Sequence, residues 1–208
     1  MIEQIGNYPA TLALIFITGL VSLYALFNAA FLNAHVLHIG VVIRDREYYR
    51  LLSSGFVHAG FLHLAVNLFV LASFGPVVET NVGSYRLVFI YFLALTGGSY
   101  WTLVHNRRTP DYKAVGASGA ISGIVLSVCI FFPLSMVSVF FIPMPAIVFA
   151  ILFLLGSAIL AQRKNRIIGH EAHLGGAVSG LVGTLMIEPR ALIIFLEQMA
   201  EGLSGTQL

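Results

Sequence analysis

Six long apolar runs, almost free of charged residues, constrain this 208-residue chain more than any other feature. They lie at approximately residues 10–31, 61–80, 85–105, 115–132, 144–161 and 171–187. A run of about 20 apolar residues can cross a bilayer as a helix, and none of these runs shows the alternation of a barrel strand. They predict an all-α membrane protein in which six transmembrane helices form a single domain, residues 1–208.

Composition supports this class and excludes others. Charged residues make up only 10% of the chain, against about 25% in soluble domains. A net charge of +2 is too small to suggest a nucleic-acid partner, and the single cysteine, Cys129, permits no internal disulfide. Residues 1–9 contain Glu3 but no Lys or Arg, so we expect no cleavable signal and a retained first helix.

The connections between the runs differ in character. Residues 32–60 mix apolar side chains with a charged cluster, which predicts a first loop embedded in the membrane interface. Residues 133–145 are apolar and interrupted by prolines, which favours a tight turn or a short extended piece. Residues from about 188 to 202 have apolar side chains at helical spacing and predict a surface-lying helix, followed by a disordered tail at about 203–208.

Polar side chains stand near the beginning of the second, fourth and sixth runs. They are His63 and Asn67, then Ser118, then His173. Six spans place both chain termini on one side of the membrane, so the beginnings of these three runs face the opposite side. We therefore expect the four side chains to lie together, a short depth below one membrane surface.

Ser118 is the candidate nucleophile of this group. A membrane serine by itself is usually a packing residue, and a nucleophilic serine needs a base within hydrogen-bond reach. His173 can supply that base, because a neutral imidazole accepts a proton near pH 7. The alternative is a histidine that only packs between helices.

Small residues on both helices favour the approach of these two side chains. Gly119 and Gly123 are one turn apart in the fourth run, and Gly176 and Gly180 are one turn apart on the histidine's face of the sixth. Helices with such faces pack at short distance in membranes. The pattern therefore gives the histidine a specific place against the serine.

His63 and Asn67 are four residues apart and share one helix face. Polar residues at membrane depth are costly and usually face a cavity or a partner. Both side chains can donate hydrogen bonds, so together with the Ser118 N–H they are candidates to stabilise a developing oxyanion. The alternative is that they bind only loop carbonyls.

The tetrapeptide at residues 170–173, His-Glu-Ala-His, raises a metal site as a further alternative. Its spacing differs from the His-Glu-x-x-His that places two ligands and a base on one helix. Another histidine, His58 or His63, would have to complete the site. We predict neither a metal nor a cofactor.

Taken together, these motifs resemble the rhomboid intramembrane serine proteases over essentially the whole chain. The matching stretches are Tyr49-Arg50-Leu-Leu, His58-Ala-Gly-Phe-Leu-His63-Leu-Ala-Val-Asn67, Gly116-Ala-Ser118-Gly119 and Ala172-His173-Leu-Gly-Gly176-Ala-Val-Ser-Gly180. Their order on the second, fourth and sixth helices makes the resemblance specific. It implies the minimal six-helix rhomboid bundle with a membrane-embedded first loop.

The resemblance implies a Ser–His dyad that cleaves the transmembrane segments of substrate proteins through an acyl-enzyme. Ser118 matches the nucleophile and His173 the general base, and His63 and Asn67 match the oxyanion donors together with the Ser118 N–H. Gly116 matches a glycine that keeps the oxyanion site open.

Three further matches are expected to be structural. Arg50 and Glu79 match residues that hold the embedded loop and the helix ends. His58 matches a histidine that lines the water-filled cavity. The chain departs from the family pattern at Ser122, because many members have an aromatic residue there, one turn after the serine, that packs on the catalytic histidine. We therefore expect a dyad that is oriented differently.

The charge distribution and the resemblance disagree about orientation. Most basic residues lie in the first, third and fifth connections, which share one side of the membrane: Arg44, Arg46, Arg50, Arg107, Arg108, Lys113, Arg163, Lys164 and Arg166. Only Arg86 and Arg190 lie on the opposite side. The positive-inside rule places the site face in the cytoplasm, whereas bacterial rhomboids usually open outward. We favour the family orientation, because some of these arginines lie in a loop that can pack on the protein, and we expect a bacterial or archaeal inner membrane.

Two other functions are alternatives. One is an inactive relative that binds transmembrane helices as a chaperone, although such relatives usually lack the serine or the histidine. The other is a channel, since membrane histidines can relay protons. The expected partners are transmembrane-helix proteins and membrane lipid, and no pattern in the sequence specifies an oligomeric state.

Overall fold

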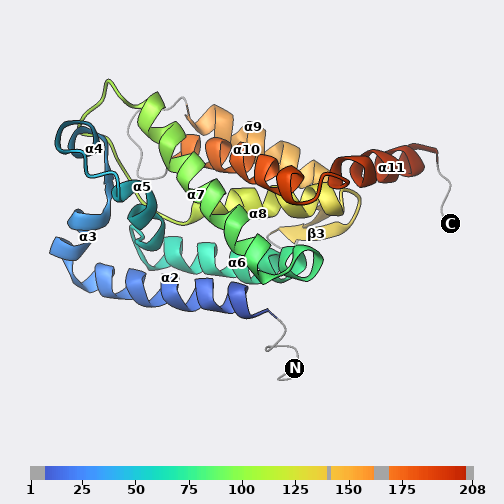
Figure 1. Ribbon diagram of the computed structural model, residues 1–208, viewed down its shortest axis with the longest axis horizontal. Helices are drawn as coiled ribbons and strands as arrows, with labels where there is room; N and C mark the ends of the chain where they lie inside the picture. The colour runs from blue at the N-terminus through green and yellow to red at the C-terminus, as the bar shows by residue number, and fades with distance from the viewer. Residues whose placement is uncertain (1–7, 140–141, 162–168, 205–208) are drawn as a thin grey trace.

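The computed structural model describes residues 8–139, 142–161 and 169–204, which are almost entirely helical (Figure 1). The longer helices are α2 (Pro9–Phe27), α6 (Phe61–Val82), α7 (Ser84–His105), α8 (Ser118–Phe131), α9 (Ala146–Ala161), α10 (His170–Ile187) and α11 (Ala191–Ser204). The first connection holds α3 (Ala29–His35), β1 (Leu37–His38), α4 (Ile39–Asp45), α5 (Arg50–Ser53) and the 3-10 turn η1 (Ser54–Phe56). Strand β2 (Lys113–Ala114) pairs with β1, and β3 (Met136–Val139) pairs with β4 (Ile142–Pro145), both antiparallel.

Helices α2, α6 and α7 are each long and apolar enough to cross a membrane. Helices α10 and α11 pass the same test as a pair, but they are bent by 103° relative to each other. Helix α8 has 14 residues, which gives it a length of about 21 Å at the usual rise. The described residues thus form a helical membrane protein with three or four full-length candidate spans and shorter apolar helices. The prediction of six spans is therefore confirmed only in part.

The side chains of α2 have the distribution of a helix in lipid. Thr11, Thr18 and Ser22 are buried against the rest of the protein, whereas Phe16 and Phe27 are 66% and 82% exposed. Large apolar side chains are stable at such positions when lipid surrounds them, while small residues face neighbouring helices. Helix α2 therefore has one protein-facing side and one lipid-facing side.

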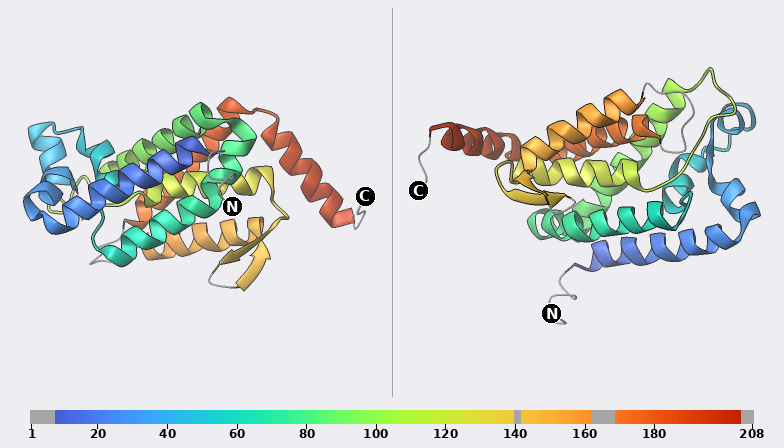
Figure 2. Two further views of the ribbon diagram at one scale, coloured as in Figure 1. Left: turned by 90° about the horizontal axis from the view of Figure 1, so that it is seen from below. Right: turned by 180° about the vertical axis from the view of Figure 1, so that it is seen from behind.

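Helices α7, α8 and α10 form the packed centre of the bundle. Helix α2 packs along α6 on one side of this centre, and α9 packs against α10 and α8 on another (Figures 1 and 2). Helices α6, α8 and α10 all begin at the end of the bundle that carries α3, α4 and α5 (Figure 1). The beginnings of the second, fourth and sixth apolar segments therefore lie at one end, which is the arrangement that the span count predicts.

The carboxylate of Glu79 joins three helices near the opposite end. It accepts hydrogen bonds from the backbone N–H groups of Ala10 and Thr11, at 2.9 and 2.8 Å. The hydroxyls of Thr11 and Ser84 donate to it as well, at 2.6 and 2.7 Å. The first N–H groups of a helix have no acceptor within that helix and carry a partial positive charge. Glu79 of α6 therefore caps α2 and ties it to the start of α7.

Arg50 holds the first connection together. Its guanidinium donates to the carbonyl oxygens of Asn33 and Val36, at 2.8 and 2.9 Å. It also forms a 2.6 Å ion pair with Glu47, and the hydrogen bonds from Arg50 and Tyr49 lower the pKa of Glu47. The carbonyls at the end of a helix have no intrahelical donor, so this buried arginine stabilises the end of α3. Arg50 packs on the protein, as we expected for some arginines of this loop.

One element differs clearly from the prediction, and one predicted connection is confirmed. The first apolar segment was expected to continue to residue 31, but α2 ends at Phe27. Asn28 breaks it, because its side chain accepts the N–H of Phe31 and begins α3. The turn or extended piece expected at residues 133–145 is confirmed, because this stretch contains the antiparallel strands β3 and β4.

The C-terminal segment from residue 191 is helical to Ser204. The surface-lying position of this helix, α11, stays a prediction. Most of the expected disordered tail, residues 205–208, lies outside the described residues.

Substitution of Glu79 tests its capping role. Glu79→Gln replaces a charged, two-oxygen acceptor by an amide with one oxygen, and a hydrogen bond to a charged group contributes about 1.5–3 kcal/mol. We expect the free energy of unfolding in detergent micelles to fall by about 2 kcal/mol or more. Glu197→Gln, at an exposed position of α11, is the matched control and should change it little. Equal stability of the two variants would show that the cap contributes nothing.

Candidate active site

Glycines allow α8 and α10 to approach each other directly. A Cβ at Gly176 would overlap the carbonyl of Gly119, and a Cβ at Gly180 would overlap the backbone of Gly123. Farther along the same interface, the hydroxyls of Ser127 and Thr184 share a 2.7 Å hydrogen bond. The two small-residue faces identified in the sequence are thus brought together, and any larger side chain at these positions would separate the helices.

This approach places Ser118 and His173 in direct contact. Ser118 is the first residue of α8, and His173 lies in the first turn of α10. The Oγ atom of Ser118 and the Nε2 atom of His173 are 2.8 Å apart, within hydrogen-bond distance. A hydroxyl and an imidazole in this geometry are able to exchange a proton, which is the arrangement that an activated serine requires.

The backbone that leads into Ser118 is held by the first connection. Strand β2 pairs with β1 through the partners Leu37 and Ala114. Next along the chain, the N–H of Gly116 donates to the carbonyl of Ser54 at 2.9 Å. The N–H of Ala117 donates to Nε2 of His58 at 3.3 Å. These contacts satisfy the backbone N–H groups of residues that belong neither to a helix nor to a long strand. The first connection therefore determines where α8 begins.

His58 links α2 to the backbone that leads into α8, whereas its expected place at a water-filled cavity stays a prediction. Its ring is fully buried, and its Nδ1 atom lies 2.7 Å from the hydroxyl of Ser22. That hydroxyl donates to the carbonyl of Phe56 at 2.7 Å, so Nδ1 carries the proton and Nε2 accepts from Ala117. Burial, together with the nearby His63, lowers the pKa of His58 to about 3, which keeps the ring neutral in this role.

Gly116 gives His63 room beside the entry to α8. The φ angle of Gly116 is +114°, a conformation that other residues rarely adopt. A Cβ at this position would lie 2.9 Å from Nε2 and 2.7 Å from Cε1 of His63. The glycine is therefore required both for the turn and for the position of the imidazole.

A cavity of about 220 Å³ lies between α6, α8, α9 and α10. Its polar lining consists of His63, Asn67, Ser118, Ser122 and His173, and its apolar lining of Val66, Val70, Ile121, Val125, Phe149 and Phe153. All four side chains predicted to converge therefore border one space. The side-chain amide of Asn67 donates to the carbonyl of His63 at 2.7 Å, so only its second N–H is available to the cavity.

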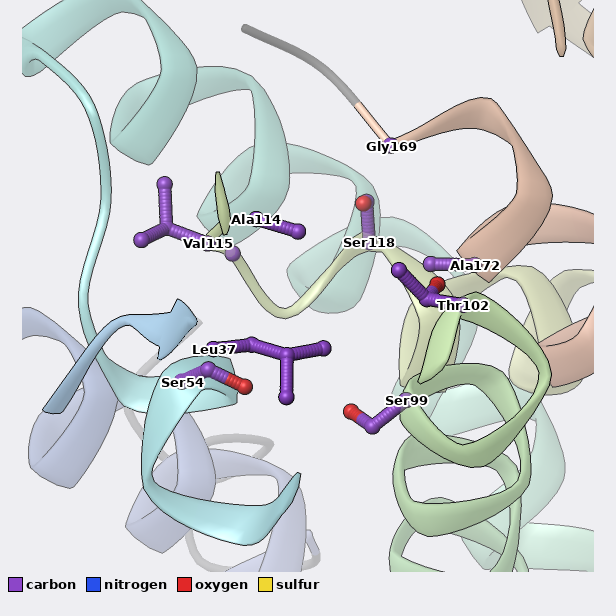
Figure 3. Close-up of a pocket in the computed structure, with 10 residues that line it drawn as sticks. Leu37, Ser54, Ser99, Thr102, Ala114, Val115, Ser118, Gly169 and Ala172 are labelled. Atoms are coloured by element: carbon purple, nitrogen blue, oxygen red, sulfur yellow. The ribbon is translucent and has the colours of Figure 1, made fainter. Parts of the chain in front are cut away.

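A second, smaller cavity lies behind Ser118 (Figure 3). Its volume of about 20 Å³ is enough for one water molecule. The hydroxyls of Ser54 and Ser99 point toward one another across this space in Figure 3, and Thr102 and Gly116 also line it. None of the three hydroxyl residues was predicted from the sequence, since single serines and threonines in apolar helices carry no distinctive pattern.

Phe153 of α9 is another residue that the sequence did not indicate. Its ring stacks on the imidazole of His173, with ring centroids 5.6 Å apart and planes inclined by 23°. Ser122, where relatives often have an aromatic residue, instead donates its hydroxyl to the carbonyl of Ser118 at 2.6 Å. The aromatic contact to the imidazole therefore comes from α9 and not from position 122, while a different orientation of the dyad stays a prediction.

The described residues contain no group of three or more His, Cys, Asp or Glu side chains placed to hold a metal ion. Glu171 of the His-Glu-Ala-His tetrapeptide is buried, and its carboxylate accepts a 2.8 Å hydrogen bond from Asn106 at the end of α7. This contact fixes the first turn of α10, which carries His173.

The chain is similar in sequence to known proteins. Residues 45–190 match the Rhomboid domain. RHOMBOID-like protein 12, mitochondrial, of Arabidopsis thaliana is 30% identical over 179 residues, 76% of this chain and 52% of that protein. Presenilin-associated rhomboid-like protein, mitochondrial, of Homo sapiens is 31% identical over 141 residues, 63% of this chain and 36% of that protein. The chain spans about half, or less, of the length of these relatives.

The fold and the site define a helical, multi-pass membrane protein with a serine and a histidine in hydrogen-bond contact. Since the family match covers more than half of the chain, the chain belongs to the rhomboid family. The two relatives named above are mitochondrial proteins, so they give no support to the bacterial or archaeal membrane that we expected.

Proposed function

We propose that this protein is an intramembrane serine endopeptidase that cleaves transmembrane segments of other membrane proteins. The observation that carries the proposal is the 2.8 Å contact between Ser118 Oγ and His173 Nε2. It lies beside a largely apolar cavity, which suits an apolar substrate segment. Membership of the rhomboid family supports the same reaction.

The first half of the reaction forms an acyl-enzyme. His173 takes the proton of Ser118 as the hydroxyl oxygen attacks the peptide carbonyl. The resulting oxyanion is stabilised by N–H groups, for which the candidates are His63, Asn67 and the first-turn N–H of Ser118. The protonated His173 then gives its proton to the leaving amine as the peptide C–N bond breaks. The C-terminal fragment departs with a new amino terminus, and the N-terminal part stays on Ser118 as an ester.

Water completes the reaction. A water molecule, activated by His173, attacks the acyl carbonyl and releases Ser118. The 20 Å³ cavity behind Ser118 has the size and the hydroxyl lining to hold such a water close to the nucleophile. Its position at the start of α8 supports the view that water enters from the end of the bundle that carries α3 to α5.

The proposal includes a six-span arrangement in the membrane. The hydrocarbon core of a membrane is about 30 Å thick. The short helix α8, which is about 21 Å long, would not cross all of it, so in this arrangement α8 would begin below the membrane surface. A substrate helix would enter sideways past α9, since Phe149 and Phe153 of α9 border the cavity. Substrate segments whose ends unwind easily would reach Ser118 most readily.

The orientation of the site face is part of the proposal. We favour the family orientation, which opens the site away from the cytoplasm. Two arginines of the first connection are paired within the protein, Arg50 with Glu47 and Arg44 with Asp45. The side chain of Arg50 is 8% exposed and packs on the protein, so it counts less as free positive charge, whereas that of Arg44 is 74% exposed and still counts. Three other basic residues of the count, Arg163, Lys164 and Arg166, lie outside the described residues.

Removal of the nucleophile tests the reaction. Ser118→Ala should abolish cleavage of a labelled transmembrane substrate by the purified protein in detergent, because no other group forms the acyl-enzyme. The matched control is Ser73→Ala, at an exposed position of α6, which should cleave at the wild-type rate. Cleavage that persists in Ser118→Ala would remove Ser118 as the nucleophile and with it the proposal, whereas a wild-type protein that does not cleave would favour a binding role.

The oxyanion donors give a second, graded test. Asn67→Ala should lower kcat about 100-fold, the effect of removing one such donor, with a smaller change in KM. Asn81→Ala is a matched control, because Asn81 makes the same hydrogen bond to the carbonyl four residues earlier but is exposed. An equal effect of the two substitutions on kcat, measured over a range of substrate concentrations, would show that Asn67 acts only within its helix.

A further inference from the structure

The stacking of Phe153 on His173 joins the dyad to a helix that contributes neither of its members. Ser118 belongs to α8 and His173 to α10, whereas Phe153 belongs to α9. The ring centroids are 5.6 Å apart and the planes nearly parallel, within the range in which aromatic pairs attract each other. Both rings also border the large cavity, so the contact lies at the place where substrate would bind.

The ring of Phe153 is itself supported by other aromatic rings. Phe149, one turn earlier in α9, lies 5.9 Å from it. Phe149 in turn stacks on Phe74 of α6, with centroids 6.2 Å apart and planes inclined by 27°. A row of rings therefore runs from α6 through α9 to the imidazole, and the position of α9 determines where the Phe153 ring stands.

A stacked ring restricts the orientation of the imidazole, whose plane is only loosely determined by its own torsion angle. The final torsion of a histidine side chain has broad minima, and Nε2 reaches the serine hydroxyl only for a limited range of ring orientations. Ser122, whose hydroxyl is used by the Ser118 carbonyl, is too small to cover the imidazole face. When His173 takes the serine proton it also becomes a cation, which an aromatic face attracts.

We propose that Phe153 is a positioning residue for His173, so that the base is aligned with Ser118 only while α9 lies against α10. The inference rests on the proposed function, and it adds that movement of the helix past which substrate enters also changes the reactivity of the nucleophile. Phe153 itself contributes no atom to the bonds that form or break.

Reaction of Ser118 with a small fluorophosphonate tests this role without transmembrane substrate. We would measure the second-order rate constant for phosphonylation of the purified wild-type protein and of its Phe153→Leu and Phe153→Tyr variants. Leucine keeps an apolar side chain but has no ring face, so we expect a rate about 3–10-fold lower, whereas tyrosine should stay within about twofold of wild type. Leu152→Ala, at an exposed position next to Phe153, is the control for α9 and should leave the rate unchanged.

Two results would overturn the inference. One is a wild-type rate for Phe153→Leu, which would make Phe153 a cavity-lining residue only. The other is an equal loss in Leu152→Ala, which would attribute the effect to the packing of α9 as a whole. If the inference about Phe153 is wrong but the proposed function is right, cleavage of a transmembrane substrate will still depend on Ser118. The two failures can therefore be distinguished.

Discussion

The direct backbone contact between α8 and α10 is the interaction on which the site depends. Lipid is as apolar as a leucine side chain, so membrane helices associate through close packing and hydrogen bonds more than through burial of apolar surface. Here glycines leave no side chain between the facing backbones near the start of the two helices, and Gly119 meets Gly176 without intervening atoms. Ser118 is the residue before Gly119, and His173 lies one turn before Gly176. The same packing therefore brings the hydroxyl and the imidazole within 2.8 Å of each other.

The entry to α8 is non-helical backbone inside an apolar protein, and its polar groups must have partners. The first connection provides them: Ser54 accepts from Gly116, and His58 accepts from Ala117. Arg50 and the β1–β2 pair hold that connection in turn. The first connection thus supports the backbone of Ser118, which explains why residues far from Ser118 in the sequence are needed for its position.

The sequence predicted the parts of the structure that follow from direction and spacing. The common end for His63, Ser118 and His173 followed from the number of apolar runs, and the glycine faces followed from their one-turn spacing. The Phe153 contact and the end of α2 at Asn28 were not predicted. A phenylalanine in an apolar helix looks the same whether it faces lipid or an imidazole, and one asparagine between two apolar stretches is compatible with a continuous helix. Such features depend on tertiary packing that periodicity does not encode.

The central claim is that helix packing activates one serine through one histidine, and identification of the modified residue tests it most directly. The purified protein would be treated with a fluorophosphonate and digested, and the adduct located by peptide mass spectrometry. The account predicts a single adduct on Ser118 that is lost in His173→Gln, while an exposed-site variant such as Ser73→Ala retains it. An adduct spread over several serines, or one on Ser118 that forms equally fast without His173, would contradict it.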